Sequence, residues 1–272
     1  MESVAFWAGA TLYAAATAAF FAWLAFRRPA LARFALLAAL AALVPHGLAL
    51  ALRWAEVGHG PFSTRYEVLS ANAFLLVVVY VVAVRIAPAL RGLGALVLPA
   101  AFLLLGLSVD SFALKSEVPI IFKSYWLYLH IGFAKLFGAT TILAAACAAG
   151  YLAKARERRF AASLPSPARL DLYAHQLLLL AFLCLGVMIA AGSLWAHQSW
   201  GRYWAWDPIE TSSLATWIVF GLILHLRVLH GWTGARMAYL TFVALALTVV
   251  TVYVVTLAAP TIHTFYLVGT PP

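Results

Sequence analysis

The stretch WAHQSWGRYWAWDPIE, residues 195–210, separates two long apolar segments, residues 172–194 and 211–227. It holds four tryptophans, a tyrosine, a histidine and an arginine. Tryptophan collects at membrane–water interfaces because its ring is apolar while its N–H bonds to water. A general interfacial belt spreads its tryptophans over many helix ends, whereas this stretch concentrates them. This tryptophan-rich tract therefore predicts a flat aromatic platform for a large amphiphilic ligand, placed between two membrane helices.

The composition of the whole chain fits a membrane setting. The 272 residues are 65% hydrophobic and only 10% charged, whereas soluble proteins carry about 25% charged residues. The first apolar segment, residues 4–26, starts without the basic residues of a cleaved signal peptide, so we expect a retained span. Cys147 and Cys184 lie far apart inside apolar segments, which predicts packing roles rather than a metal or redox site. The composition predicts an all-α, polytopic integral membrane protein.

Eight segments are long and apolar enough to cross a bilayer. A hydrocarbon core of about 30 Å takes about 20 residues of helix. The predicted spans are residues 4–26, 31–53, 67–87, 93–109, 125–150, 172–194, 211–227 and 236–258. We expect one transmembrane domain over residues 1–272, with residues 195–211 as an external tryptophan-rich segment that binds the ligand.

The basic residues are distributed unevenly between the two sides of these spans. Twelve of the 18 lysines and arginines lie in the connections after the first, third, fifth and seventh spans, and five lie on the opposite side. The positive-inside rule makes the first set cytoplasmic, so both termini and the tryptophan-rich tract are predicted to face outward. The net charge of +9 is then explained by topology and indicates no nucleic-acid partner.

Four of the eight histidines form two pairs when they are sorted by depth. His46 and His225 lie within the second and seventh spans, while His130 and His263 lie near or beyond the outer ends of the fifth and eighth. Neutral imidazole is a common ligand of haem iron, and two axial histidines hold the iron while leaving the ring edges exposed. For any single buried histidine, a hydrogen bond to a neighbouring helix is the alternative. Two depth-matched pairs beside an aromatic platform favour haem.

The other histidines and one lysine carry weaker indications. His175 and His230 are predicted at cytoplasmic helix ends, where a cation meets the helix terminus or water. His59 is expected in an outer turn, as a solvated loop residue. His197 lies in the tract, where contact with a ligand and a structural role are both open. Lys135, inside the fifth span, is expected to extend outward or to meet an anion such as a haem propionate.

Helix-start signals define the end of the tract. In Asp207-Pro208-Ile209-Glu210, an aspartate N-cap, a proline at the first helical position and a glutamate at the third predict that the seventh span begins here. Arg53, at the end of the second span, and Tyr66-Glu67, at the start of the third, are predicted to be interfacial anchors and helix-end charges.

Residues 200–211, WGRYWAWDPIET, resemble the tryptophan-rich "WWD" signature of haem-handling proteins. Three further segments are similar to segments of the same family and occur in the same order along nearly the whole chain. They are residues 53–67, before the signature, and residues 217–236 and 260–266, after it. On these residues the chain is similar to the CcsA (ResC) family of the system II cytochrome c maturation pathway. Two positions depart from the family pattern: His197 stands where an amide-type residue is expected and Ile209 where a lysine is expected.

The resemblance implies roles for individual residues. His130 and His263 are the implied external ligands of the iron of haem b (iron protoporphyrin IX), and His46 and His225 are the implied transmembrane ligands. The residues expected to contact the porphyrin or its propionates are Trp195, Trp200, Trp204, Trp206, Asp207 and Arg202. No residue of the chain is expected to act as a catalytic nucleophile.

The implied function is that of a haem-binding subunit of a holocytochrome c synthase in the bacterial cytoplasmic membrane. It would move or present haem to the outer side for thioether attachment to the Cys-x-x-Cys-His motif of apocytochrome c. The implied partners are a ResB (CcsB) membrane protein, apocytochrome c, membrane lipid and, indirectly, thiol-reducing thioredoxin-like proteins.

Three alternatives remain open. A haem exporter without ligase activity would bind haem but attach none. A small-solute transporter that used the histidines as a proton relay would be colourless. In a purely structural membrane subunit, the tract would be only an enlarged interfacial belt.

Overall fold

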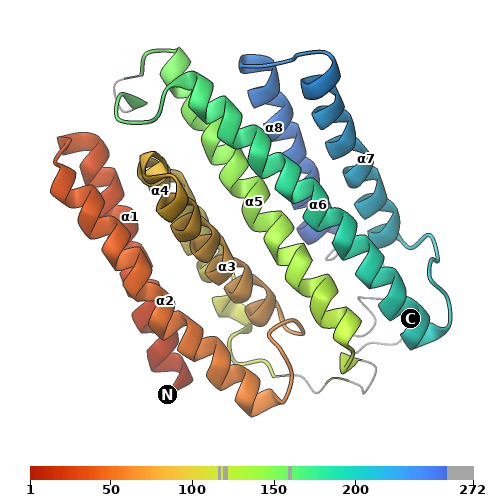
Figure 1. Ribbon diagram of the computed structural model, residues 1–272. Coiled ribbons are helices and arrows are strands. Elements are labelled where there is room, and N and C mark those ends of the chain that lie inside the picture. The colour runs from red at the N-terminus through yellow and green to blue at the C-terminus, as the bar shows by residue number, and fades with distance from the viewer. Residues whose placement is uncertain (116–117, 119–121, 159–160, 256–272) are drawn as a thin grey trace. The chain divides into compact units, whose positions relative to one another are not determined.

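The computed structural model describes residues 1–115, 118, 122–158 and 161–255. Every regular element in these ranges is helical, and eight stretches are long and apolar enough to cross a membrane (Figure 1). They are α1 (Glu2–Phe26), α2 (Pro29–Val57), α3 (Arg65–Ile86), η1 with α4 (Pro88–Leu93 and Gly94–Gly106), α5 (Tyr125–Ala155), α6 (Pro167–Trp200), α7 (Pro208–Leu229) and α8 (Ala235–Val249). The predicted all-α fold of a polytopic membrane protein is confirmed.

The contacts divide the chain into two compact units. Unit 1 consists of Met1–Ser116 and Ala149–Leu170, and unit 2 of Glu117–Ala148 and Asp171–Pro272. Most of α5 and α6 belongs to unit 2, while the last residues of α5 and the first of α6 belong to unit 1. The prediction of a single domain over the whole chain stays a prediction.

Unit 1 is built on close contacts between its first four helices. α1 packs against α2 and α4, and α3 packs against the same two helices (Figure 1). The buried face of α2 is mostly alanine, and small residues let helix backbones approach closely inside a membrane. At Gly9 of α1, an added Cβ would lie 3.1 Å from the Cβ of His46 in α2. The backbones of α1 and α2 therefore approach closely where His46 lies.

Unit 2 has a continuous apolar core to which four helices contribute. Phe137 of α5 packs edge-on against Phe220 of α7, with ring centroids 5.4 Å apart, and Leu185 of α6 and Met237 of α8 belong to the same buried cluster. α8 continues into a π-helical stretch, η5 (Val250–Val254). This core fixes the positions of the helix ends, from which the tryptophan-rich tract and several histidines project.

The start of α7 matches the prediction. The carboxylate of Asp207 accepts the N–H of Ile209 at 2.8 Å, and Glu210 accepts the N–H of Asp207 at 3.2 Å, so the two form a reciprocal capping box. The end of α6 differs from the predicted span. The helix runs for 34 residues, about 51 Å at 1.5 Å per residue, which exceeds a bilayer core. Trp195 and Trp200 are therefore helical, and the loop of the tract comprises only residues 201–207.

Candidate functional site

The loop of the tryptophan-rich tract holds one residue in a strained conformation. Trp206 has φ of 59°, a left-handed value that bulky side chains rarely adopt. Glu210 accepts the main-chain N–H of Ala205 at 2.8 Å and that of Asp207 at 3.2 Å, and so holds the chain on both sides of Trp206. The hydroxyl of Thr211 donates to the Trp206 carbonyl at 3.3 Å. Glu210 is thus both the N3 residue of α7 and the clamp of the loop.

The four tryptophans form two edge-to-face pairs rather than the predicted flat surface. Trp195 is buried, Trp200 and Trp204 are half-buried, and Trp206 is 70% exposed. Trp195 and Trp200 meet at an interplanar angle of 73° and Trp204 and Trp206 at 88°, with ring centroids 5.0 and 5.8 Å apart. Edge-to-face pairs are the arrangement that the ring quadrupoles favour. Trp206 is accordingly the tryptophan with most surface available to a ligand.

Unit 2 contains a shallow pocket beside these rings. Its walls come from α5, α6, the loop and α7, and the lining residues are His130, Met188, Ile189, Gly192, Ser193, Ala196, Tyr203, Trp204, Ile209, Glu210 and Ser213. The pocket is small compared with a porphyrin. A ligand the size of a porphyrin would therefore lie across the mouth of the pocket. His130 and Trp204, both predicted to contact haem, therefore line the same pocket.

His130 has a defined protonation pattern. Its Nδ1–H donates to the carbonyl oxygen of Met188 at 2.8 Å, and a carbonyl can only accept, so in the neutral ring the lone pair is on Nε2. The imidazole also lies nearly parallel to the indole of Trp195, with ring centroids 6.5 Å apart and an interplanar angle of 28°. A histidine whose other ring nitrogen is bonded to a main-chain carbonyl is the usual form of a metal ligand. His130 is therefore suited to bind iron through Nε2.

The sequence left the role of His197 open and did not point to Gly192 or Met188 as residues of this site. Tyr203 lies parallel to His197, with ring centroids 4.1 Å apart, so His197 joins the end of α6 to the loop as a structural contact. Gly192 faces the His130 ring, and Met188 supplies the carbonyl that it bonds. An isolated glycine inside an apolar helix was the available signal, because such glycines commonly mark a close approach.

The other predicted residues of the tract have separate positions. Arg202 is exposed on the loop, while Asp207 is buried and caps α7. Lys135 is half-buried within α5. His263 lies outside the described residues, so its pairing with His130 stays a prediction.

The other end of unit 2 carries a second group of polar residues. Asp171 of α6 forms an ion pair with Arg227 of α7 at 2.5 Å and accepts the main-chain N–H of Gly234, just before α8, at 3.0 Å. His225 is exposed on α7, and its ring centroid lies 5.6 Å from that of His230, the C-cap of the same helix. His225 and His46 belong to different units, so their pairing stays a prediction.

His175 is not at a helix end as predicted. It lies within α6, which begins at Pro167 rather than near residue 172, and its ring is half-buried. The hydropathy pattern left out residues 167–171 because they include Arg169 and Asp171, but the helix continues through them beyond the apolar segment.

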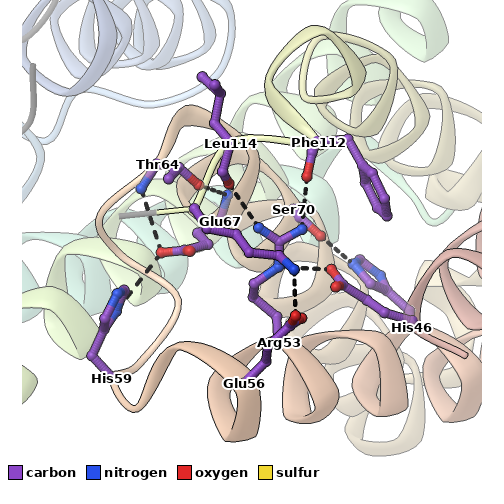
Figure 2. A network of polar contacts seen from close by, with 11 residues as sticks. His46, Arg53, Glu56, His59, Thr64, Glu67, Ser70, Phe112 and Leu114 are labelled. Atoms are coloured by element: carbon purple, nitrogen blue, oxygen red, sulfur yellow. Dashed lines mark hydrogen bonds and ion pairs between the residues drawn. The ribbon is translucent and has the colours of Figure 1, made fainter. Parts of the chain in front are cut away.

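Unit 1 encloses His46 completely. The ring is 1% exposed, and its Nδ1 lies 3.2 Å from the hydroxyl of Tyr13 in α1. Its Nε2 lies 2.9 Å from the hydroxyl of Ser70 in α3 (Figure 2). A hydroxyl can donate or accept, so both bonds form in either tautomer of the ring. Phe74 packs edge-on against the imidazole, with ring centroids 5.4 Å apart. His46 therefore connects α1, α2 and α3.

Arg53 is buried, where the sequence predicted an interfacial anchor. Its side chain is 1% exposed and forms an ion pair with Glu2 at 2.8 Å. Its two terminal nitrogens donate to the carbonyls of Leu114 and Phe112 at 2.8 and 2.7 Å (Figure 2), and its guanidinium lies over the ring of Tyr66, 4.6 Å from the centroid. Arg53 thereby ties the start of α1, the end of α2 and the segment after α4 together.

The turn before α3 is also buried. His59 is 1% exposed, not solvated as predicted, and its Nδ1 lies 2.8 Å from the carbonyl of Gly60 and 3.9 Å from the carboxylate of Glu67. Glu67 accepts the N–H of Ser63 at 2.9 Å and shares a capping box with Thr64, which starts α3. The predicted helix-end charge is thus the internal acceptor of a folded turn (Figure 2).

The fold and these sites define a polytopic, all-helical membrane protein with histidines beside a tryptophan-rich loop. The family model described as "Cytochrome C assembly protein" matches residues 4–263, and the chain belongs to that family. Proteins named "Cytochrome c biogenesis protein CcsA" are 31% identical over 229 residues in Trieres chinensis and 29% identical over 252 residues in Synechococcus sp. (strain CC9605). These alignments cover 70% and 79% of this chain and 73% and 81% of the relatives.

Two further comparisons define the extent of the similarity. The CcsA protein of Chlamydomonas reinhardtii is 30% identical over 211 residues, which cover 72% of this chain and 58% of the relative. The solved structure of "Cytochrome c Heme Lyase CcmF" superposes with a TM-score of 0.71 at 18% identity, over 99% of this chain and 48% of that one. The chain thus spans about half the length of the CcmF chain and shares its fold. The resemblance to the CcsA type is confirmed, and the protein functions in cytochrome c biogenesis.

Proposed function

We propose that this protein is the haem-binding subunit of a system II cytochrome c synthase and that it holds haem b as a substrate at the loop end of unit 2. The observation that carries the proposal is the pocket in which His130, with its Nδ1–H bonded to a carbonyl, lies beside Tyr203 and Trp204. An imidazole of known tautomer next to aromatic rings is what binding of a flat iron porphyrin requires.

The geometry of the pocket suggests how haem would lie. Because the pocket is too shallow for a porphyrin, the ring would cover its mouth, with His130 below the iron and the exposed indole of Trp206 against the porphyrin edge. Arg202, exposed on the same loop, is a suitable partner for a propionate. His263 is the proposed second ligand, and the family match extends to that residue.

The proposed reaction needs positioning more than a protein nucleophile. Each cysteine thiol of the Cys-x-x-Cys-His motif adds across one vinyl group, with sulfur bonding to one vinyl carbon and the thiol hydrogen ending on the other. A fixed porphyrin with accessible vinyl edges would lower the entropic cost of this addition. The apocytochrome thiols must arrive reduced, which is the proposed indirect role of thioredoxin-like proteins.

His225 and His46 are the proposed transmembrane ligands, and they differ in exposure and in the hydrogen bonds that their rings make. His225 is exposed on the surface of α7 and is accessible from the membrane or to a partner. His46 has a hydroxyl on each ring nitrogen. Ligation of iron by His46 therefore requires that Ser70 or Tyr13 give up its hydrogen bond.

A ResB (CcsB) membrane protein is the proposed partner, in the bacterial cytoplasmic membrane with both termini outside. Of the 18-residue apolar stretch in each helix, only 28% is buried in α7 and 33% in α8 with its continuation to Val254, compared with 56% in α3. This leaves much apolar surface on unit 2 for lipid or for another membrane protein. The asymmetric distribution of basic residues supports the orientation.

The test is reconstitution with a ResB-type partner and an apocytochrome carrying one Cys-x-x-Cys-His motif. We expect the purified protein to show a haem spectrum and the reporter to gain covalently bound haem. In the double variant His130→Gly, His263→Gly we expect lower haem content, a changed spectrum and no covalent attachment, while haem at the transmembrane site remains. His175→Gln, away from the loop, is the matched control and keeps both signals. A haem spectrum without covalent attachment would indicate the exporter, and a colourless protein would indicate the small-solute transporter.

A further inference from the structure

We propose that Gly192 and the main-chain carbonyl of Met188 are positioning groups that select the tautomer and orientation of His130, and so make Nε2 its iron-binding nitrogen. This inference rests on the proposed function, in which His130 binds haem iron. Neither group is expected to touch haem; they act through the imidazole alone.

The first support is the contact between the His130 ring and α6. A Cβ added at Gly192 would lie 2.6 Å from Nδ1 and 2.9 Å from Cε1 of His130. Real Cβ atoms do not approach other heavy atoms that closely, and the ring belongs to a short side chain on a packed helix. Any side chain at position 192 must therefore push the imidazole away from α6. Glycine at this position leaves the space that the ring fills.

The second support is the identity of the bonded carbonyl. Met188 precedes Gly192 by four residues, and in an α-helix the carbonyl of residue i accepts the N–H of residue i+4. A carbonyl has two acceptor lone pairs, so it can accept a second bond when the neighbouring side chain does not cover it. Because residue 192 has no side chain, the Nδ1–H of His130 reaches the Met188 carbonyl at 2.8 Å. The same glycine thus gives both the space and the acceptor.

The third support is the aromatic ring of Trp195, which lies next to the His130 imidazole. Its indole, 2% exposed, lies at 28° to the imidazole with ring centroids 6.5 Å apart. Trp195 follows Gly192 by three residues and therefore lies on the same side of α6. Gly192 meets one edge of the imidazole and the indole of Trp195 lies beside the ring at a small angle, which together restrict rotation of the ring. Without this restriction, the ring could exchange its nitrogens between the carbonyl and the pocket.

The consequence for binding follows from the chemistry of histidine. A carbonyl bonded to Nδ1–H excludes the alternative tautomer and increases the basicity of Nε2, and loss of such a bond typically lowers metal affinity about 10- to 100-fold. The chain offers a matched control in Gly138 of α5, because a Cβ added there meets no atom within 4 Å. Gly192→Ala and Gly138→Ala therefore make the same chemical change, but only Gly192→Ala is expected to move the His130 ring.

The tautomer is measured in haem-free protein by long-range ¹H–¹⁵N correlation spectra of histidine-labelled samples, with His130→Gln used to assign the signal. We expect Nδ1 protonated and Nε2 unprotonated in the parent chain and in Gly138→Ala. In Gly192→Ala we expect that Nδ1 of His130 is no longer the only protonated ring nitrogen. An Nε2-protonated His130 in the parent chain overturns the inference even if Gly192→Ala does not fold.

Haem titration of the same variants gives the second readout. We expect Gly192→Ala to weaken haem binding about 10- to 100-fold and to change the visible spectrum, while Gly138→Ala matches the parent chain. Unchanged affinity and spectrum in Gly192→Ala overturn the inference. If His130→Gln itself leaves haem binding unchanged, the proposed function fails instead, so the two failures are distinguishable.

Discussion

His46 in unit 1 and His130 in unit 2 are both membrane-helix histidines, yet their surroundings differ in one respect. His46 has side-chain hydroxyls on both ring nitrogens and is almost fully enclosed, whereas the Nδ1–H of His130 donates to a main-chain carbonyl and the residue lines a pocket. In sequence both are single histidines within apolar helices, and only their predicted depths differ. The contrast teaches that the bonds already made by a buried histidine, rather than its depth, indicate whether it is prepared to bind a ligand.

The largest effect on stability is expected when the buried polar network of unit 1 is broken at Arg53. Arg53→Ala leaves the Glu2 carboxylate and two carbonyls without their donor, and removal of one partner from a buried ion pair costs about 3–5 kcal/mol. We expect a large drop in the thermal unfolding temperature in detergent. The control is Arg65→Ala, which removes an exposed ion pair with Asp110 worth about 0–1 kcal/mol. Equal stability of the two variants would contradict the comparison.

The next effect tests whether the loop of unit 2 is as firmly held as the polar sites of unit 1. Glu210→Ala removes the acceptor of two main-chain N–H groups beside Trp206, at about 1–3 kcal/mol for a buried donor left unsatisfied. We expect lower stability and greater exposure of Trp206 to fluorescence quenchers. Glu210→Gln keeps an acceptor oxygen, so its stability and its Trp206 quenching should lie between those of the parent chain and of Glu210→Ala. Unchanged quenching in Glu210→Ala would show that other contacts hold the loop.

A smaller effect addresses His46 directly. Ser70→Ala removes the hydroxyl bonded to Nε2, which should lower stability by about 1 kcal/mol. If iron replaces this bond, haem affinity at the transmembrane site should rise about fivefold, because 1.4 kcal/mol corresponds to a factor of ten. Haem titration of a chain that also carries His130→Gly isolates that site. A loss of stability with unchanged affinity would leave His46 as a structural residue only.

The smallest effect concerns the ring contact that joins α6 to the loop. His197→Asn removes the stacking on Tyr203, a contact worth about 0.5–1.5 kcal/mol for aromatic pairs. A double-mutant cycle with Tyr203→Ala measures this energy. We expect coupling near that size with haem binding retained. A large loss of haem would instead give His197 a ligand-contact role.

The features predicted correctly from sequence depend on local patterns. The eight helices follow from apolar length, and the start of α7 follows from the spacing of Asp207 and Glu210. The family resemblance rested on ordered motifs and is likewise confirmed.

The features that were missed depend on contacts between distant residues. Arg53 and Glu2 are 51 positions apart, and His130 and Met188 are 58 apart. No local pattern distinguishes a buried arginine from one at an interface. A glycine in an apolar helix signals a close approach at position 192 but does not tell which side chain it faces. The predicted iron ligands belong to the same class of long-range relations.

Trp206 illustrates how stability and use can select different amino acids at one position. Its left-handed backbone is one that glycine adopts without strain, and a bulky residue there costs about 1–3 kcal/mol. Trp206→Gly should therefore relieve the backbone while removing the most exposed indole of the tract. A selection for thermal resistance alone would discard this tryptophan. Screens that aim to make the protein easier to purify should score ligand binding alongside unfolding temperature.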